Sequence, residues 1–176
     1  MIRFLAARGE QIVVLTDGVL AVFAAHRQLR LRDSEAGGQL FARFDGREIR
    51  VEQATGPRRG DGRSRFSFIP SRWAERREIK RMHKQGLHYV GDWHTHPERR
   101  PTPSCTDRDS MQEMFRASKH DLAGFLMVIV GTDDGPAGLY VGVVDGERAE
   151  HLVPLLTLEI GTKSARNGVL GIGEDG

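Results

Sequence analysis

Residues 94–107 read His-Thr-His-Pro-Glu-Arg-Arg-Pro-Thr-Pro-Ser-Cys-Thr-Asp, and their order predicts a strand followed by a helix. Side chains on a strand alternate between its two faces, so His94 and His96 would share one face. The prolines that follow interrupt regular structure, and Ser104 stands where a helix should begin. Asp107 would then lie in the first turn of that helix. Two imidazoles and one carboxylate are therefore expected to meet where the strand ends and the helix starts.

This donor set is typical of a zinc site. Structural zinc sites use four protein ligands, whereas catalytic sites use three and leave the fourth tetrahedral position to water. We therefore predict one zinc per chain, held by His94, His96 and Asp107, with an open fourth position. The chain contains no Gly-x-Gly-x-x-Gly or P-loop sequence, so no nucleotide cofactor is implied.

The same stretch resembles the signature of the JAMM (MPN-plus, JAB-domain) zinc metalloproteases. That signature is His-Ser/Thr-His-Pro, six residues, Ser, two residues and Asp, with a glutamate further upstream. Every position from His94 to Asp107 matches it without an insertion. Over residues 10–157 the chain is similar to the short, stand-alone prokaryotic members of the family. The resemblance implies an MPN/JAB-like, cytidine-deaminase-like architecture.

The resemblance also implies roles for two further residues. The upstream glutamate is identified with Glu35, which stands just before a pair of glycines that lets backbones approach closely. Asp33 and Glu48 are the alternatives. Glu35 would act as general acid-base on the attacking water, and Ser104 would stabilise the oxyanion. Ser104 and Asp107 also fit a capping box, so helix capping is a second interpretation of both.

Two neighbouring residues have competing interpretations. Asp92 would share a strand face with His94 and could orient its imidazole, although a neutral strand role fits as well. Cys105 would lie at a helix N-terminus, where a thiol becomes more acidic. A thiol protease requires neither the second imidazole nor the carboxylate at this spacing, so we interpret Cys105 as a small packing residue.

Length and composition predict a single domain without a membrane segment. The chain has 176 residues, and its longest apolar run, 125–130, is far shorter than a membrane span. We place the metalloprotease domain at residues 1–160 and a flexible Gly-rich tail at 161–176. The N-terminus lacks a secretory signal and the chain has one cysteine, which favours a reducing cytoplasm.

Periodicity outlines the remaining elements. Helices and strands alternate, which predicts a single layered α/β domain with a mixed, largely antiparallel sheet flanked by helices. Asp-Gly pairs at 45–46 and 145–146 suit tight turns between strands. The expected strands are 11–15, 40–44, 48–51, 66–69, 88–93, 125–130, 138–144 and 150–156, the expected helices are 17–29 after an N-cap at Thr16, 71–86 with Trp73, Ile79 and Met82 toward the core, and 104–119, and an exposed loop is expected at 56–63.

By resemblance, the substrate is a ubiquitin-like protein or its conjugate, cleaved at the amide bond that follows the C-terminus of the ubiquitin-like protein. The reaction would serve deconjugation or precursor processing. The resemblance also suggests ubiquitin-activating-like and ubiquitin-conjugating-like proteins as partners in the pathway. A peptidase that processes a small sulfur-carrier protein is a close alternative. A non-catalytic MPN scaffold or nucleic-acid-associated module is an alternative of another class.

Residues 58–84 carry ten Arg or Lys against three acidic residues. Such a run is usually a solvated helix face and loop, but it also suits nucleic acid or an acidic protein face. We expect no membrane partner and no nucleic-acid partner. The arginines of the loop 56–65 are expected to contact an acidic face of a bound substrate.

Overall fold

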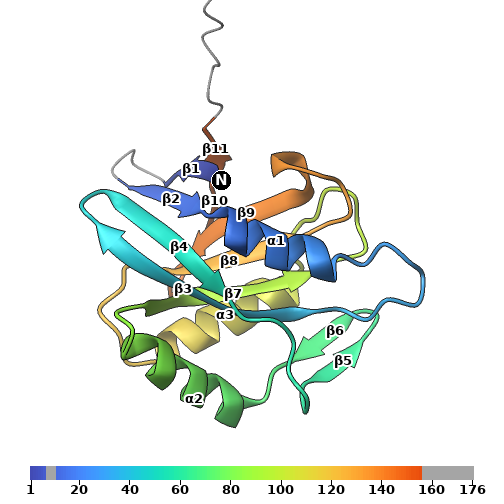
Figure 1. Cartoon of the computed structure of the whole chain (residues 1–176), viewed down its shortest axis with the longest axis horizontal. Helices are drawn as coiled ribbons and strands as arrows, with labels where there is room; N and C mark the ends of the chain where they lie inside the picture. Colours follow the sequence, from blue (N-terminus) through green and yellow to red (C-terminus); the bar gives the residue numbers. More distant parts are fainter. Residues whose placement is uncertain (7–10, 156–176) are drawn as a thin grey trace, which may run out of the picture.

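Figure 1 shows the computed structural model, which describes residues 1–6 and 11–155. These residues form one large sheet with helices on both faces, as the sequence predicted, and a separate hairpin that was not predicted. In chain order the elements are β1 Ile2–Leu5, β2 Ile12–Leu15, α1 Asp17–His26, β3 Gly37–Asp45, β4 Glu48–Ala54, β5 Gly62–Ser64, β6 Ser67–Ile69, α2 Arg72–His83, β7 His88–Thr95, α3 Cys105–Ala117, β8 Phe125–Val130, β9 Leu139–Val144, β10 Ala149–His151 and β11 Val153–Pro154.

The large sheet has the strand order β10-β9-β8-β7-β3-β4-β2-β1-β11. The pairs β2 with β4 and β7 with β8 are parallel, and the other pairs in the described sheet are antiparallel. This confirms the prediction of a mixed, largely antiparallel sheet. β5 and β6 pair only with each other and stand apart from the sheet.

The sheet curls until its two edges approach each other. β10 pairs with β9 at one edge, and β11 pairs with β1 at the opposite edge. Only Leu152 separates β10 from β11 in the chain, and it is 1% exposed. The single strand predicted at 150–156 was therefore wrong, because the segment changes partners at Leu152. Strand β1 was not predicted, since four residues carry too little periodicity to be recognised.

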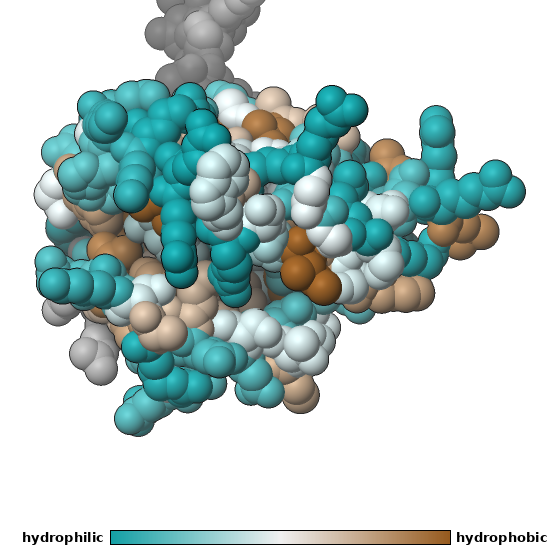
Figure 2. All heavy atoms as spheres, turned by 90° about the horizontal axis from the view of Figure 1, so that it is seen from below, coloured by the Kyte–Doolittle hydropathy of each residue, from teal (hydrophilic) through white to brown (hydrophobic). Residues whose placement is uncertain are grey.

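The core has two layers, one on each side of the sheet. α1 covers one face, where Val19 and Phe23 join the larger hydrophobic cluster. α2 and α3 lie against the opposite face (Figure 1). β8 is buried along its whole length because it contributes to both layers: Met127 packs with the α3 residue Met111, and Val128 packs with the cluster under α1. Seen from the side of α2 and α3, the surface is mainly hydrophilic, with small hydrophobic patches between polar side chains (Figure 2).

Several local predictions need correction. α1 ends at His26 rather than near residue 29, because Arg27 is extended and its guanidinium donates to the carbonyl oxygen of Thr132 at 3.2 Å. Thr16 occupies the N-cap position, but its side chain makes no capping hydrogen bond. The loop at 56–63 is shorter than expected because β5 begins at Gly62.

The second helix was predicted to place Trp73, Ile79 and Met82 in the core. Met82 is buried and Ile79 packs against its cluster, whereas Trp73 is 68% exposed. Trp73 lies in the first turn of α2, where its ring stacks under the guanidinium of Arg77 at 4.5 Å instead of reaching the sheet. Among the described residues, no helix combines the length and the apolar character that a membrane crossing requires. The predicted tail 161–176 lies outside the described residues.

Candidate active site and metal centre

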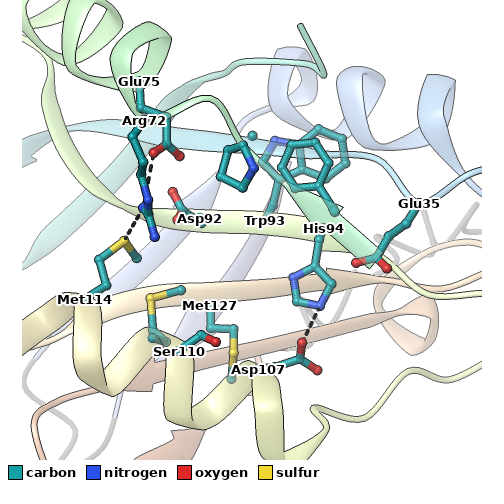
Figure 3. Close-up of a pocket in the computed structure, with 14 residues that line it drawn as sticks. Glu35, Arg72, Glu75, Asp92, Trp93, His94, Asp107, Ser110, Met114 and Met127 are labelled. Atoms are coloured by element: carbon teal, nitrogen blue, oxygen red, sulfur yellow. Dashed lines mark hydrogen bonds and ion pairs between the residues drawn. The ribbon is translucent and has the colours of Figure 1, made fainter. Parts of the chain in front are cut away.

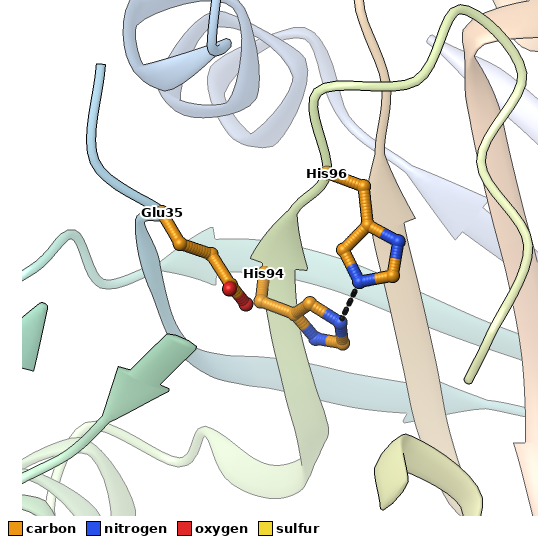
Figure 4. Close-up of side chains that lie close together, drawn as sticks. All are labelled: Glu35, His94 and His96. Carbon is orange, nitrogen blue, oxygen red and sulfur yellow. Dashed lines mark hydrogen bonds between the residues drawn. The ribbon is translucent and has the colours of Figure 1, made fainter. Parts of the chain in front are cut away.

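His94 lies near the C-terminal end of β7, His96 directly follows the strand, and their rings point to the same side. Their Nε2 atoms are 3.1 Å apart (Figure 4). Asp107, in the first turn of α3, approaches both rings: its Oδ1 lies 3.4 Å from His94 Nε2 and its Oδ2 lies 3.6 Å from His96 Nε2. The side chains of the three residues are 15% to 18% exposed. The structure thus brings together all three predicted metal ligands.

Thr95, between the two histidines, faces the opposite side and is fully buried. Its hydroxyl accepts a hydrogen bond from the backbone N–H of Ala36 at 3.0 Å and donates to the side chain of Gln28 at 3.0 Å. Its own backbone N–H donates to the carbonyl oxygen of Ala36 at 2.8 Å. This residue therefore locks the strand that carries the histidines to the segment that carries Glu35. Sequence reasoning missed Thr95 and Gln28, because their partners are distant in the chain.

Glu35 precedes β3, which runs antiparallel to β7 with Gly37 opposite His94. A Cβ atom at Gly37 would lie 2.7 Å from the carbonyl oxygen of Trp93, and one at Gly38 would lie 2.0 Å from that of Thr55. The paired glycines therefore permit the close backbone approach that the sequence suggested. The carboxylate of Glu35 lies with the ring nitrogens of His94 and His96, and one ligand atom of each falls within 4.8 Å of the others (Figure 4).

Ser104 and Asp107 form the capping box at the start of α3. The Ser104 hydroxyl accepts from the backbone N–H of Asp107 at 3.1 Å, and Asp107 Oδ2 accepts from the backbone N–H of Ser104 at 2.7 Å. The hydroxyl also donates to Asp107 Oδ2 at 2.7 Å. The capping interpretation is thus present in the structure. It also fixes the carboxylate of Asp107 beside the histidines, so capping and metal binding are compatible.

The surroundings shift the pKa values of the titratable groups of the site in different directions. Burial raises the pKa of Glu35 from an ordinary 4.5 to about 7; the charge of His94 opposes this rise and that of Asp107 adds to it. Burial also raises the pKa of Asp107, but the hydrogen bond and charge of His94 and the hydrogen bonds from Ser104 outweigh it, so the pKa is well below its usual range. Burial and then the charge of His94 lower the pKa of His96. Near neutral pH the site therefore combines an ionised Asp107, a neutral His96 and a half-ionised Glu35.

A cavity of about 150 Å³ opens beside His94, between α2, α3 and β7 (Figure 3). Asp92 lies in its wall and accepts a hydrogen bond from the hydroxyl of Tyr89 at 3.0 Å. Glu75 and Arg72, which also line the cavity, form an ion pair at 3.2 Å. Burial, and next the charge of Glu75, raise the pKa of Asp92 to about 7. Part of the Asp92 surface faces the cavity although protein surrounds its carboxyl group.

Asp92 shares the cavity side of β7 with His94, as predicted, because the two residues are two positions apart on the strand. A bulge precedes both of them. The register shifts between Leu40 and Phe41, so Val90 is the extra residue. Gly91 follows with a φ of +143°, and a Cβ atom there would lie 1.9 Å from the carbonyl oxygen of Leu126. Only glycine fits this position.

The donor set suits a divalent metal of the zinc type. Two imidazole nitrogens and one ionised carboxylate converge, and the shift at His96 favours the neutral ring that binds metal. Glu35 is the next carboxylate, close enough to act on water held at the site.

The remaining candidates lie elsewhere. Asp33 accepts from the backbone N–H of Arg30 at 2.8 Å, and Glu48 pairs with Arg3 on the sheet. Cys105 is exposed and its sulfur accepts from Arg108 at 3.6 Å, so it is not the packing residue we expected. It is the first residue of α3, where its side chain remains exposed.

Comparison with known proteins places the chain in a family. The family described as prokaryotic homologs of the JAB domain matches residues 16–140. The chain belongs to the prokaryotic JAB-domain family. It is therefore an enzyme of the JAMM metallopeptidase type, as the sequence predicted. The match includes the strand, the helix and the glutamate segment of the site.

Relatives of this JAB-domain enzyme carry names consistent with that chemistry. A protein of Pseudomonas aeruginosa named CD-NTase/cGAS isopeptidase is 34% identical over 138 residues, which cover 72% of this chain and 79% of that protein. A protein of Vibrio cholerae with the same name is 31% identical over 126 residues, covering 70% and 78%. A probable metalloprotease of Sinorhizobium fredii is 41% identical over 59 residues, covering 31% and 36%.

A solution structure of a protein from Desulfitobacterium hafniense has the same fold. It superposes with a TM-score of 0.56 at 22% sequence identity and covers 79% of this chain and 88% of that one.

Proposed function

We propose that this JAB-domain enzyme is a zinc isopeptidase that hydrolyses the amide bond joining the C-terminal tail of a folded protein to an amine. The observation that carries the proposal is the convergence of His94, His96 and Asp107, with the Glu35 carboxylate beside them. A zinc ion held by the two imidazoles and Asp107 would supply Lewis acidity to lower the pKa of water and polarise the scissile carbonyl.

Glu35 provides the proton transfers. A carboxyl group with a pKa of about 7 can accept a proton from attacking water and return it to the leaving amine near neutral pH. Burial raises this pKa because it disfavours the charged carboxylate. The positive charge of a bound zinc ion would oppose that rise and favour the ionised form, which is the base. Ser104 would stabilise the oxyanion on the substrate. Its hydroxyl would have to turn from Asp107 Oδ2 toward the substrate, which leaves its capping bond from the Asp107 backbone intact.

The surroundings of the site suit an extended tail. The β5–β6 hairpin borders the cavity through Phe68, and its neighbours Phe66 and Ile69 are 73% and 65% exposed. A short hairpin outside the main sheet can add a third strand from a substrate, with backbone hydrogen bonds that tolerate different side chains. The apolar exposed residues would hold the body of the substrate.

The names of the relatives guide the choice of substrate. Because two relatives are named CD-NTase/cGAS isopeptidases, a conjugate of a CD-NTase is the first substrate to test. A conjugate of a ubiquitin-like protein, predicted from the sequence, is the second, and a sulfur-carrier precursor is the third. The assay compares zinc-loaded enzyme with chelator-treated enzyme on each substrate and on casein. Rapid digestion of casein would contradict an isopeptidase that depends on a docked, folded protein.

The non-catalytic alternative makes a different prediction. A scaffold or nucleic-acid-associated module would use the basic residues 58–84 and would not need an ordered set of zinc donors. The half-buried, ionised Asp107 beside two histidines supports catalysis instead. Zinc-loaded protein that bound a conjugate or nucleic acid without cleaving any conjugate would favour the scaffold.

A further inference from the structure

The candidate base stands on irregular backbone. Glu35 lies between the turn at residues 31–32 and the start of β3, so no helix or ladder of its own fixes it. A carboxylate must keep its place to within a fraction of an ångström to transfer protons efficiently. Other contacts must therefore hold this residue.

The β5–β6 hairpin supplies such contacts to both sides of the Glu35 peptide. The backbone N–H of Glu35 donates to the carbonyl oxygen of Ser64 at 2.7 Å. Arg63 Nε donates to the carbonyl oxygen of Glu35 at 2.7 Å, and Arg63 Nη2 donates to the carbonyl oxygen of Ser34 at 3.3 Å. One arginine thus binds two consecutive carbonyl groups with its planar fork of donors.

On the opposite side, the next residue is fixed by the metal-binding strand. Both backbone groups of Ala36 bond to Thr95, whose neighbours are His94 and His96. Glu35 is therefore held between the strand that carries the histidines and the hairpin that carries Arg63. Loss of the hairpin contacts would leave it anchored on one side only.

We propose that Arg63 is a positioning residue for hydrolysis, which holds the backbone of Glu35 so that its carboxylate stays beside the metal ligands. The proposal rests on the proposed function, because it requires Glu35 to be the base. It also revises the expectation that the arginines of this loop contact an acidic substrate face. Arg63 is occupied by two carbonyl groups, and Arg58 donates to Gln39 at 3.0 Å and to Thr55 at 3.1 Å. Arg59, which is exposed as Arg63 is, provides a comparison in the same loop.

Positioning and docking affect different kinetic constants. A misplaced base slows the chemical step, so Arg63→Ala should lower kcat by about 10-fold to 10²-fold with KM within about twofold. A docking cation would instead raise KM and make it more sensitive to salt. Arg63→Lys keeps a donor within reach of one carbonyl and should recover part of kcat. Arg59→Ala should keep the native kcat, and any contribution of Arg59 to docking should appear in KM alone.

A double-mutant cycle with Glu35→Gln tests whether Arg63 acts through the base. The full-length, zinc-loaded chain is assayed as native enzyme, each single variant and the double variant. If Arg63 only positions Glu35, Arg63→Ala should have little further effect once Glu35 is Gln. Equal losses in both backgrounds would overturn the proposal. If Glu35→Gln itself retained native activity, the choice of base would fail, and that result is distinct from a failure of Arg63.

Backbone hydrogen exchange provides a measurement independent of activity. In Arg63→Ala, exchange at Glu35 and in residues 62–69 should accelerate, while β7 and the zinc content should remain native. Arg59→Ala should leave all of these unchanged. Native exchange at Glu35 in a folded Arg63→Ala variant would contradict the proposal. A general loss of protection would instead show that Arg63→Ala unfolds the protein, and Arg63→Lys then provides the test. A reduced kcat with native protection outside residues 35 and 62–69 would support positioning. A native kcat with native exchange at Glu35 would oppose it.

Discussion

The two walls of the site are built in different ways. The wall that carries the proposed metal ligands, called here the metal-binding wall, consists of His94 on a central strand, His96 directly after it and Asp107 at a capped helix start. Regular structure thus places His94 and Asp107, and the backbone bond from His96 to Val130 extends the strand pairing to His96. The base wall consists of Glu35 on irregular backbone, which a small hairpin outside the main sheet holds through Ser64 and Arg63. The comparison teaches that the fold itself fixes the ligands, whereas the base depends on a local, removable support.

The largest expected effect is at the metal-binding wall. His94→Ala should lower zinc content well below one per chain and reduce turnover by more than about 10⁴-fold, because the group that brings the pKa of water from about 15.7 toward 7 is lost. Elemental analysis after dialysis and a cleavage assay measure both. Retention of one tightly bound zinc by the folded variant would remove His94 from the ligand set.

The next largest effect is expected at Glu35, where loss of turnover should be separable from loss of zinc. Glu35→Gln should keep one zinc per chain but lower kcat by about 10² to 10⁴, as for the loss of a general acid-base. Zinc content and kcat are measured on the same preparation. Glu48→Gln is the matched control, because Glu48 pairs with Arg3 away from the site. If Glu35→Gln lost its zinc, Glu35 would be a metal ligand, and the distinction between the metal-binding wall and the base wall would fail.

The sequence predicted that His94, His96 and Asp107 would lie close together, and the structure confirms this proximity, because its determinants are local. His94, His96, Ser104 and Asp107 lie within 14 residues, and strand period and capping chemistry fix their relative directions. Glu35 was reached through family resemblance and the paired glycines.

The hairpin and its arginine could not be predicted in the same way. Arg63 contacts Glu35 across 28 residues, and β5 and β6 have three residues each, too few for a periodic pattern. The strand change at Leu152 was missed because β11 pairs with a distant partner: Val153 lies opposite Leu5, which is 148 residues earlier in the chain (153 − 5 = 148). β10, in contrast, pairs with the neighbouring strand β9. Exposure of Trp73 shows that an aromatic residue in a first helical turn need not face the core.

A smaller effect concerns the cavity between the helices and its dependence on pH. The raised pKa of Asp92, about 7, means that between pH 4 and 7 the folded protein retains a proton that the unfolded chain has released. The contribution of protonated Asp92 to the free energy of unfolding is therefore complete below pH 4 and is lost as pH rises through 7. Asp92→Asn should therefore reduce the loss of unfolding free energy between pH 5 and 8 by on the order of 2 kcal/mol.

Urea unfolding of chelator-treated protein at several pH values measures this dependence, and Asp109→Asn on the exposed side of α3 is the control. If unfolding free energy depended on pH in the same way in native protein and Asp92→Asn, water in the cavity would hydrate this carboxyl group fully, and its pKa would not be raised.

The smallest expected effect on stability is at the helix start. Ser104→Ala removes one half of the capping box and should lower unfolding free energy by about 1 kcal/mol. If Ser104 also stabilises the oxyanion, kcat should fall by at least about 10² as well. Ser104→Gly keeps a favourable N-cap residue without a hydroxyl, so most of the stability should recover while kcat does not. Recovery of both would leave Ser104 a capping residue alone.

The most direct test of the central claim is cleavage in H₂¹⁸O of a CD-NTase, or in a second sample a ubiquitin-like protein, joined through its C-terminal carboxyl to a lysine side chain. Mass spectrometry reads the released protein. The account predicts an intact protein with one ¹⁸O atom in its new C-terminal carboxylate, release that stops with chelator and returns with one equivalent of zinc, and no release by Glu35→Gln on the same timescale. No release of either protein by zinc-loaded enzyme, or release that persists in Glu35→Gln, would contradict it.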